Sequence, residues 1–301
     1  MVGELAPDAK LIEVGSNLGF AAGCNRGAEA ASGELLVLLN PDAVPGPGWR
    51  DAIERPARDG RGWGAWMALV TAERGRVVNT SGGVVHFTGI AWAGNAGEPA
   101  EAAAAHGPHE VAFASGACLA IPLEAWREQG GFPESFFLYE EDVDLSLRVR
   151  LAGGRVGIEP RAVVDHDYEF DKGAAKWRYL ERNRWAMLLR TYPAALLVLI
   201  APALLATEVA LLFVSLAGGW GPQKLRATGE TLVALPRLLR ERREIQARRA
   251  IGPAEFADSL TAELSSPHLG RVRGFAPLRW ALTGYWSLVR ALLGAGSSRS
   301  G

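Results

Sequence analysis

Residues 34–42 read ELLVLLNPD, an apolar run at 35–39 that ends abruptly at Asn40-Pro41-Asp42. A continuous apolar run of this length is typical of a strand buried on both faces of a sheet. Upstream, residues 10–14 form a second strand candidate, and residues 21–31 have the pattern of a helix. This strand–helix–strand order predicts an α/β domain with parallel strands, in which ligands gather beyond the carboxyl ends of the strands.

The segment Asn40-Pro41-Asp42 has two interpretations. All three residue types favour turns, and Pro41 cannot continue a central strand. A carboxylate at a strand end can also hold a divalent cation, because Mg²⁺ in proteins typically combines one or two carboxylates with the phosphates of a substrate. The segment alone does not decide between a turn and a ligand site.

Four carboxylates lie within residues 140–144, directly after the aromatic stretch 136–139. Apolar rings and like charges raise the pKa of a carboxyl group unless a cation or hydrogen bonds compensate, which suits the group to proton abstraction. The same acids would stabilise the first turn of a helix, in which Asp144 pairs with Arg148. Both interpretations can hold at once. The apolar residues at 143–151 fit strand alternation as well as helical spacing.

Residues 165–167 read Asp-His-Asp and follow two short strand-like runs, 155–158 and 162–164. A single histidine is more often a structural or surface residue than a ligand, although imidazole is a common metal ligand. The flanking acids would orient the second ring nitrogen of His166, as metal-binding histidines require. A metal site at His166 is therefore one of two open interpretations.

The composition excludes a disordered protein and a disulfide-stapled miniprotein, because 49% of the 301 residues are hydrophobic and two are cysteines. Residues 1–170 carry 13 basic and 24 acidic side chains, whereas residues 171–301 carry 19 and 9. We therefore expect two domains with these bounds. The negative charge of the first domain argues against nucleic acid as a partner. The first ten residues have no secretory signal, so the first domain is expected in the cytoplasm.

The basic half contains an apolar run, residues 194–217, that is long enough to cross a bilayer and carries one charge, Glu208. An acid at mid-depth costs roughly 3 kcal/mol on insertion scales. A buried core helix is the alternative, but the aromatic and basic residues before the run favour a membrane. Both flanks are basic, so the sequence does not predict an orientation. The run fits a re-entrant or interfacial element as well as a single span. Basic amphipathic helices are also expected at 225–245, broken at Pro236, and at 275–293.

Taken together, these segments resemble the inverting family 2 glycosyltransferases of the GT-A fold, especially the rhamnosyltransferase-like branch that builds bacterial surface polysaccharides. The resemblance spans about residues 11–166 and is specific through the order and spacing of its pieces. These are NLGFAAGCNRG at 17–27, LLNPD at 38–42, SGA at 115–117, GGF at 130–132 and FLYEEDVDL at 137–145 with Arg148. The resemblance implies a Rossmann-like mixed α/β sheet followed by an α-helical, membrane-associated region. It also favours a helix from about 142 to 152.

The resemblance implies roles for individual residues. Asp142, paired with Glu141, matches the general base of the family. The segment Asn40-Pro41-Asp42 matches the metal motif of this branch, so Asp42 would carry most of the contact with Mg²⁺ or Mn²⁺. His166 matches a histidine that joins the metal ligands in some relatives. The implied donor-binding residues are Asn17, Gly19, Asn25, Asn40 and Asp42.

The implied activity is metal-dependent, inverting transfer of a sugar from a nucleotide-diphosphate donor to a lipid-linked or polysaccharide hydroxyl, in cell-surface glycan synthesis at the cytoplasmic face of the bacterial inner membrane. The cation and backbone amides would neutralise the leaving group while the base deprotonates the acceptor. The family normally has a further strand–helix–strand unit before the Asn-x-Gly-Phe segment, and 16 residues precede Asn17 here. The alternative function is therefore a non-catalytic, membrane-tethered scaffold or partner derived from such an enzyme.

Overall fold

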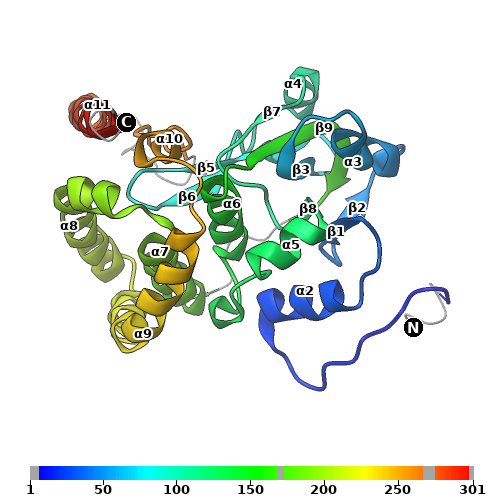
Figure 1. Ribbon diagram of the computed structural model, residues 1–301, viewed down its shortest axis with the longest axis horizontal. Helices are drawn as coiled ribbons and strands as arrows, with labels where there is room; N and C mark the ends of the chain where they lie inside the picture. The colour runs from blue at the N-terminus through cyan, green and yellow to red at the C-terminus, as the bar shows by residue number, and fades with distance from the viewer. Residues whose placement is uncertain (1–6, 168–172, 267–274, 298–301) are drawn as a thin grey trace.

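The computed structural model describes residues 7–167, 173–266 and 275–297. An α/β part comes first and a helical part follows (Figure 1). The α/β part contains α2 (Gly19–Glu29), β1 (Leu35–Leu39), β2 (Val44–Pro45), α3 (Trp49–Arg58), β3 (Trp63–Ala72), β4 (Val77–Thr80), β5 (Gly83–Val85), β6 (Ala91–Ala93), α4 (Ala100–Ala105), β7 (His109–Glu110), β8 (Cys118–Pro122), α5 (Leu123–Gln129), the 3-10 helix η1 (Glu134–Phe136), α6 (Glu141–Leu151) and β9 (Arg155–Asp165). The helical part contains α7 (Ala175–Thr191), α8 (Ala194–Ala217), α9 (Gly221–Ala247), α10 (Pro253–Ala257) and α11 (Ala276–Ser297).

The main sheet has the strand order β1-β8-β3-β9-β2, with β4 beside β3 and β7 beside β9. Strands β3 and β9 run parallel, and the other pairs are antiparallel. The predicted mixed α/β sheet with a following helical region is confirmed. The expectation that the 35–39 strand lies among parallel strands is wrong, because β1 pairs antiparallel with β8.

Strand β1 is the first strand in the sheet order, and in the described part of the chain it pairs with β8 alone. Its side chains alternate between half-buried and buried, and Leu39 is 37% exposed. Residues 10–14 are exposed and form no strand. The prediction of a strand buried on both faces therefore fails here, because Leu35 and Val37 on one face of β1 are half-buried and Leu39 is exposed.

Helix α6 separates two cores. Leu145 and Val149 pack in the core between the sheet and the helices α2, α3 and α5. Val143, Leu147 and Leu151 pack in a second core with residues of α7 to α11. A helix with apolar residues on both faces explains why the 143–151 sequence fits two periodicities, and the structure confirms the helix. The predicted pair in its first turns also forms, since Asp144 Oδ2 lies 2.7 Å from Arg148 Nε.

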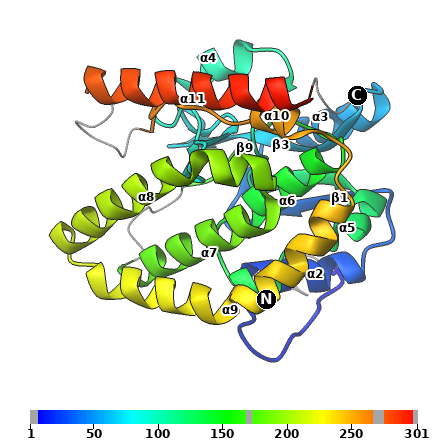
Figure 2. The same ribbon diagram turned by 60° about the vertical axis from the view of Figure 1, so that its left-hand side comes forward.

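The second core joins side chains from both halves of the sequence, and the predicted domain boundary at residue 170 lies outside the described residues. The division into domains 1–170 and 171–301 stays a prediction. Helix α8 begins and ends at the predicted residues. Helix α9 is continuous through Pro236, so the predicted break is wrong. Packing of α9 along α7 stabilises the helix across the missing N–H of the proline (Figures 1 and 2).

The segment between η1 and α6 has an unusual backbone. Phe137, Tyr139 and Glu140 have φ angles of +64°, +72° and +68°, a region that side chains other than glycine rarely adopt. Asn183 of α7 is fully buried, and its Nδ2 donates to three carbonyl oxygens of residues 136–139 at 2.7–3.0 Å. Helix α7 therefore holds this segment in the conformation that leads into α6.

We predict that Asn183→Ala lowers the free energy of unfolding by about 1–3 kcal/mol, because it removes the donor of three hydrogen bonds to the backbone of residues 136–139. Chemical denaturation of the whole chain measures the difference. Thr228→Ala on α9, which removes one hydrogen bond at an exposed position, is the matched control. Equal losses in the two variants would contradict the role given to Asn183.

Candidate active site

Asp142 is the second residue of α6, and its carboxylate is held by two backbone donors. Oδ2 accepts the N–H of Gly116 and Oδ1 accepts the N–H of Val143, both at 2.8 Å. Burial raises the pKa of Asp142, and these hydrogen bonds oppose the rise. The carboxyl group is thus fixed in orientation and has a raised affinity for a proton. The chain is tightly packed at Gly116, because an added Cβ would lie 3.2 Å from the ring of Phe20.

Glu140 and Glu141 lie beside Asp142 and are buried. Burial and the negative charge of Asp142 raise the pKa of both glutamates well above the usual value. The Oε2 atom of each has no hydrogen-bond partner in the part of the chain that the structure describes. The raised pKa values expected for this acidic group are borne out, and the alternative of stabilising acids in a helical first turn holds as well.

Asp42, Asn40 and His166 come together where β1 and β9 end. His166 Nε2 lies 3.1 Å from Asp42 Oδ1 and 3.5 Å from Asn40 Nδ2. The register of β2 on β9 explains the meeting, since Val44 lies opposite Asp165. His166 is buried, whereas the side chain of Asp42 is 65% exposed. The structure therefore brings a carboxylate, an amide and an imidazole to one point that solvent reaches.

This group of side chains fits a divalent cation in part. The Oδ1 atom of Asn40 is buried and has no hydrogen-bond partner among the described residues. Carboxylate and amide oxygens are ligands for Mg²⁺ and Mn²⁺, and imidazole binds many transition metals. Within the described ranges, no three side chains of His, Cys, Asp or Glu cluster as a metal site. A cation bound here would need further ligands, and substrate phosphates commonly supply them.

Residues 115–117, just before β8, connect Asp142 with the group formed by Asn40, Asp42 and His166. The backbone N–H of Asn40 donates to the carbonyl oxygen of Ala117 at 3.0 Å, while the neighbouring Gly116 donates to Asp142. Asn40 and Asp142 are thus held by adjacent residues of one segment. The structure brings together Asn40, Asp42 and His166 and links Asp142 to them, while the roles predicted for these residues stay predictions.

The predicted donor-binding residues of α2 make internal contacts. Asn17 Oδ1 accepts the N–H of Gly19 at 2.9 Å, and a Cβ added to Gly19 would lie 2.5 Å from atoms of Phe137. Asn25 exchanges two hydrogen bonds of 2.9 Å with the backbone of Phe132. These contacts fasten α2 to the segment that leads into α6, and donor binding by Asn17, Gly19 and Asn25 stays a prediction.

Two buried residues of α7, Asn183 and Arg184, are not among those predicted from the sequence. Arg184 donates to the carbonyl oxygen of Thr88 at 3.0 Å, and its charge opposes the rise of the Glu140 pKa caused by burial. Arg184 also forms an ion pair with Glu208. Glu181 and Arg184 are three residues apart on one helix face, and this spacing is the local signal that could have identified Arg184 as a member of an ion pair.

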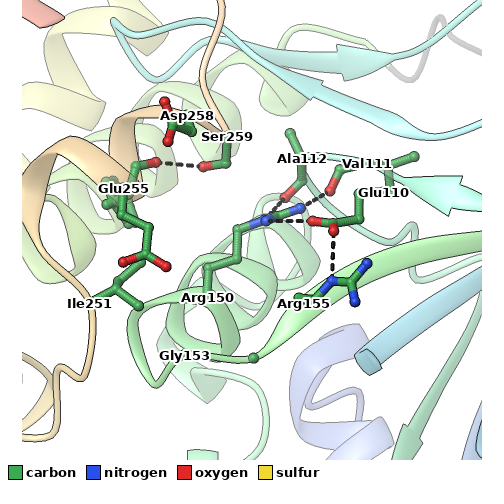
Figure 3. Close-up of a pocket in the computed structure, with 12 residues that line it drawn as sticks. Glu110, Val111, Ala112, Arg150, Gly153, Arg155, Ile251, Glu255, Asp258 and Ser259 are labelled. Carbon is green, nitrogen blue, oxygen red and sulfur yellow. Dashed lines mark hydrogen bonds and ion pairs between the residues drawn. The ribbon is translucent and has the colours of Figure 1, made fainter. Parts of the chain in front are cut away.

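A separate cavity of about 410 Å³ lies where the end of α6 faces α10 (Figure 3). Arg150 and Arg155 approach Glu110 on one side, at 3.6 and 2.6 Å, and Glu255 and Asp258 line the other side. Asp142, Asp42 and His166 do not line it. This cavity is therefore distinct from the candidate active site.

Residues 102–228 match the family model described as "Glycosyl transferase family group 2". A relative from Mycobacterium tuberculosis, N-acetylglucosaminyl-diphospho-decaprenol L-rhamnosyltransferase, is 31% identical over 182 residues, which cover 53% of this chain and 59% of the relative. The O-antigen biosynthesis protein RfbC of Myxococcus xanthus is 33% identical over 144 residues, or 44% of this chain and 11% of that protein. The chain thus spans about three fifths of the length of the first relative.

Two solved structures are similar at lower identity. GalNAc-T7 with UDP, GalNAc and Mn²⁺ has a TM-score of 0.46 and 15% identity, and the match covers 60% of this chain and 36% of that one. The mannosyltransferase PcManGT from Pyrobaculum calidifontis with GDP-Man and Mn²⁺ has a TM-score of 0.41 and 22% identity, with 82% and 69% covered. The matched segment 102–228 includes both Gly116 and Asp142, so the part of the chain that carries the candidate base is similar to glycosyl transferase family 2.

Proposed function

We propose that the chain is a metal-dependent, inverting glycosyltransferase that moves a sugar from a nucleotide-diphosphate donor to a hydroxyl group of a cell-surface glycan precursor. One observation carries the proposal: the carboxylate of Asp142, with its raised pKa, is tied through residues 116–117 to the group formed by Asn40, Asp42 and His166. A base and a candidate cation site joined by one short segment are what a single displacement on a sugar diphosphate requires.

Asp142 would act as the general base. Its two oxygens each accept one backbone N–H, which fixes the plane of the carboxylate and leaves lone pairs for an acceptor hydroxyl. The hydroxyl proton passes to a carboxylate oxygen of Asp142 as the hydroxyl oxygen attacks the anomeric carbon from the face opposite the leaving diphosphate. One displacement of this kind inverts the configuration of the sugar.

Asn40, Asp42 and His166 would hold a Mg²⁺ or Mn²⁺ ion. When bound, the cation neutralises the charge that develops on the diphosphate leaving group. Asp42 is exposed enough to reach a substrate, and the half-buried Asn40 fixes the position of the strand end through its backbone bond to Ala117. Without a cation, the net negative charge of the acidic half would repel a donor that carries two phosphates.

We propose a saccharide on a polyprenyl diphosphate as the acceptor, because the name of the mycobacterial relative specifies such a lipid-linked acceptor. The exposed apolar helix α8 supports this choice, since it would bring the chain to the membrane in which the acceptor lies. The expected location is the cytoplasmic face of the bacterial inner membrane, and nucleic acid is not an expected partner. The alternative function is a non-catalytic, membrane-tethered scaffold or partner, which would transfer no sugar.

Asp142→Asn is expected to lower kcat by about 10²–10⁴-fold, because the amide cannot accept the hydroxyl proton. The assay uses the purified chain with labelled nucleotide sugars and a polyprenyl-diphosphate-linked acceptor. Asp51→Asn, an exposed residue of α3, is the control. Full turnover in the Asp142 variant would remove it as the base, and a wild-type chain that turns over no donor would favour the scaffold.

The pH profile of kcat gives a second test of Asp142. The base has to be ionised, and burial raises its pKa, so the rate should fall as pH drops through a midpoint above the usual aspartate value of about 3.9. Asp142→Glu, which keeps an ionisable group, should retain an acidic limb with a shifted midpoint. A limb at the ordinary aspartate pKa would contradict the assignment.

Asp42→Ala and His166→Ala are each expected to weaken metal-dependent binding of a nucleoside diphosphate by about tenfold or more, since each removes a ligand. Calorimetry with UDP, GDP or dTDP in the presence of MnCl₂, and again with EDTA, measures this without turnover. The control is His106→Ala, which changes an exposed histidine after α4. Unchanged affinities for metal and nucleotide in both variants would show that the cation binds elsewhere.

A further inference from the structure

Helix α8 has an exposed apolar stripe along its whole length. Its 24 residues have a mean hydropathy of 2.5 in the most apolar stretch, of which 11% is buried, and among the described residues no other helix is long and apolar enough to cross a membrane. The stripe repeats at helical spacing. Its large exposed side chains are Val198, Leu205, Val209, Leu212, Phe213 and Leu216, with exposed fractions of 37–73%, and Val214 is 55% exposed away from the stripe.

The opposite face of α8 packs on the protein over the same length. Leu196, Ile200 and Leu204, four residues apart, are at most 6% exposed and belong to the second core, and Ser215 near the other end is fully buried. A helix that crossed the bilayer as a separate span would present apolar side chains to lipid on all sides. Helix α8 is instead attached to the protein at Leu196, Ile200 and Leu204 in its first half and at Ser215 near its end.

Glu208 attaches the same inner face through charge. Its carboxylate forms an ion pair with Arg184 of α7 and lies 2.9 Å from Lys224 Nζ of α9. Lys224 Nζ also lies 2.5 Å from Glu181 Oε2, so two acids and two bases form one network. Moving α8 into the bilayer as a span would separate these charges in a medium of low polarity, which is strongly unfavourable.

Helices α9 and α11 continue the apolar face on either side of α8. All three lie on the same side of the molecule, at the left in Figure 1 and at the front in Figure 2, and α8 contacts both of the others. Their exposed apolar side chains are Leu225, Leu232 and Val233 of α9 and Trp280, Leu288 and Leu292 of α11. Arg240 and Arg243 are exposed and follow Leu225 and Leu232 on one face of α9. Cations beside an apolar face are complementary to anionic lipid.

We propose that α8 lies in the plane of the membrane surface and that the outer faces of α8, α9 and α11 dock on an anionic lipid bilayer. The apolar stripes enter the boundary between head groups and acyl chains, and the arginines contact the head groups. The surface does not include Asp142, Asp42 or His166. This inference rests on the proposed function, because the docked surface would hold the enzyme against the leaflet that carries its acceptor.

Flotation with vesicles of phosphatidylcholine and phosphatidylglycerol in equal amounts tests the surface. The wild-type chain should float with these vesicles and less with phosphatidylcholine alone. Leu205→Glu/Phe213→Glu should weaken binding by about 100-fold, because it removes two large apolar side chains and adds two like charges. The matched control is Ala102→Glu/Ala105→Glu on exposed positions of α4. Equal vesicle binding by both double variants would overturn the proposal.

The depth of three positions distinguishes an in-plane helix from a span. Val198→Cys, Leu205→Cys and Phe213→Cys, each in a Cys24→Ser/Cys118→Ala chain, are labelled with a fluorophore and quenched by lipids that carry spin labels at known depths. The outer positions are about 22 Å apart along the helix. Equal, shallow depths are expected. A deep central position between two shallow ends would show a span and overturn the proposal.

Light scattering without lipid tests the other occupant of this face, a second copy of the chain. A stable dimer that the Leu205→Glu/Phe213→Glu change dissociates, with no vesicle binding by the wild type, would also overturn the proposal. Sugar transfer to a short-chain, soluble acceptor separates the two claims. A wild-type chain that binds vesicles but transfers no sugar would refute the proposed function. A wild-type chain that transfers sugar but binds no vesicles would refute the docking surface.

Discussion

Helix α6 is buried on two sides, and the candidate active site depends on this constraint. Its apolar residues enter both cores, so the charged side chains of Asp144 and Arg148 are buried and have to be satisfied inside the protein. Asp144 and Arg148 pair with each other, and the guanidinium of Arg148 also donates to the carbonyl oxygen of Gly131 at 2.8 Å. Arg190 of α7 lies 3.4 Å from the other oxygen of Asp144. This network allows a helix with several charges to sit between two apolar layers.

The three acids at the start of α6 differ in how their carboxylate oxygens are satisfied. Asp142 has two backbone donors, whereas Glu140 and Glu141 each keep one carboxylate oxygen without a hydrogen-bond partner in the described part of the chain. Burial therefore raises the pKa of all three carboxyl groups. A raised carboxyl pKa in the folded protein reduces the free energy of unfolding at neutral pH. We therefore interpret the raised pKa values of these carboxyl groups as serving proton transfer rather than folding.

The basic half is part of this architecture. Asn183 holds the left-handed segment before α6, and Arg184 connects that region to Glu208 of α8. The helical part thus has an inner face that positions the acidic segment and an outer face, on α8, α9 and α11, that is apolar and exposed. Glu208, which the sequence places as a charge in the middle of an apolar run, belongs to the inner face.

The sequence by itself determined the elements with local signals. Helix α8 follows Pro193 and ends before two glycines, so it begins and ends where the sequence predicts. Only the tertiary structure decided the antiparallel pairing of β1, the continuity of α9 and the contact between Asn40 and His166, which are 126 residues apart. The physical reason is range: caps and helical periodicity act within a few residues, whereas strand pairing, burial and the meeting of distant polar groups depend on which segments pack together.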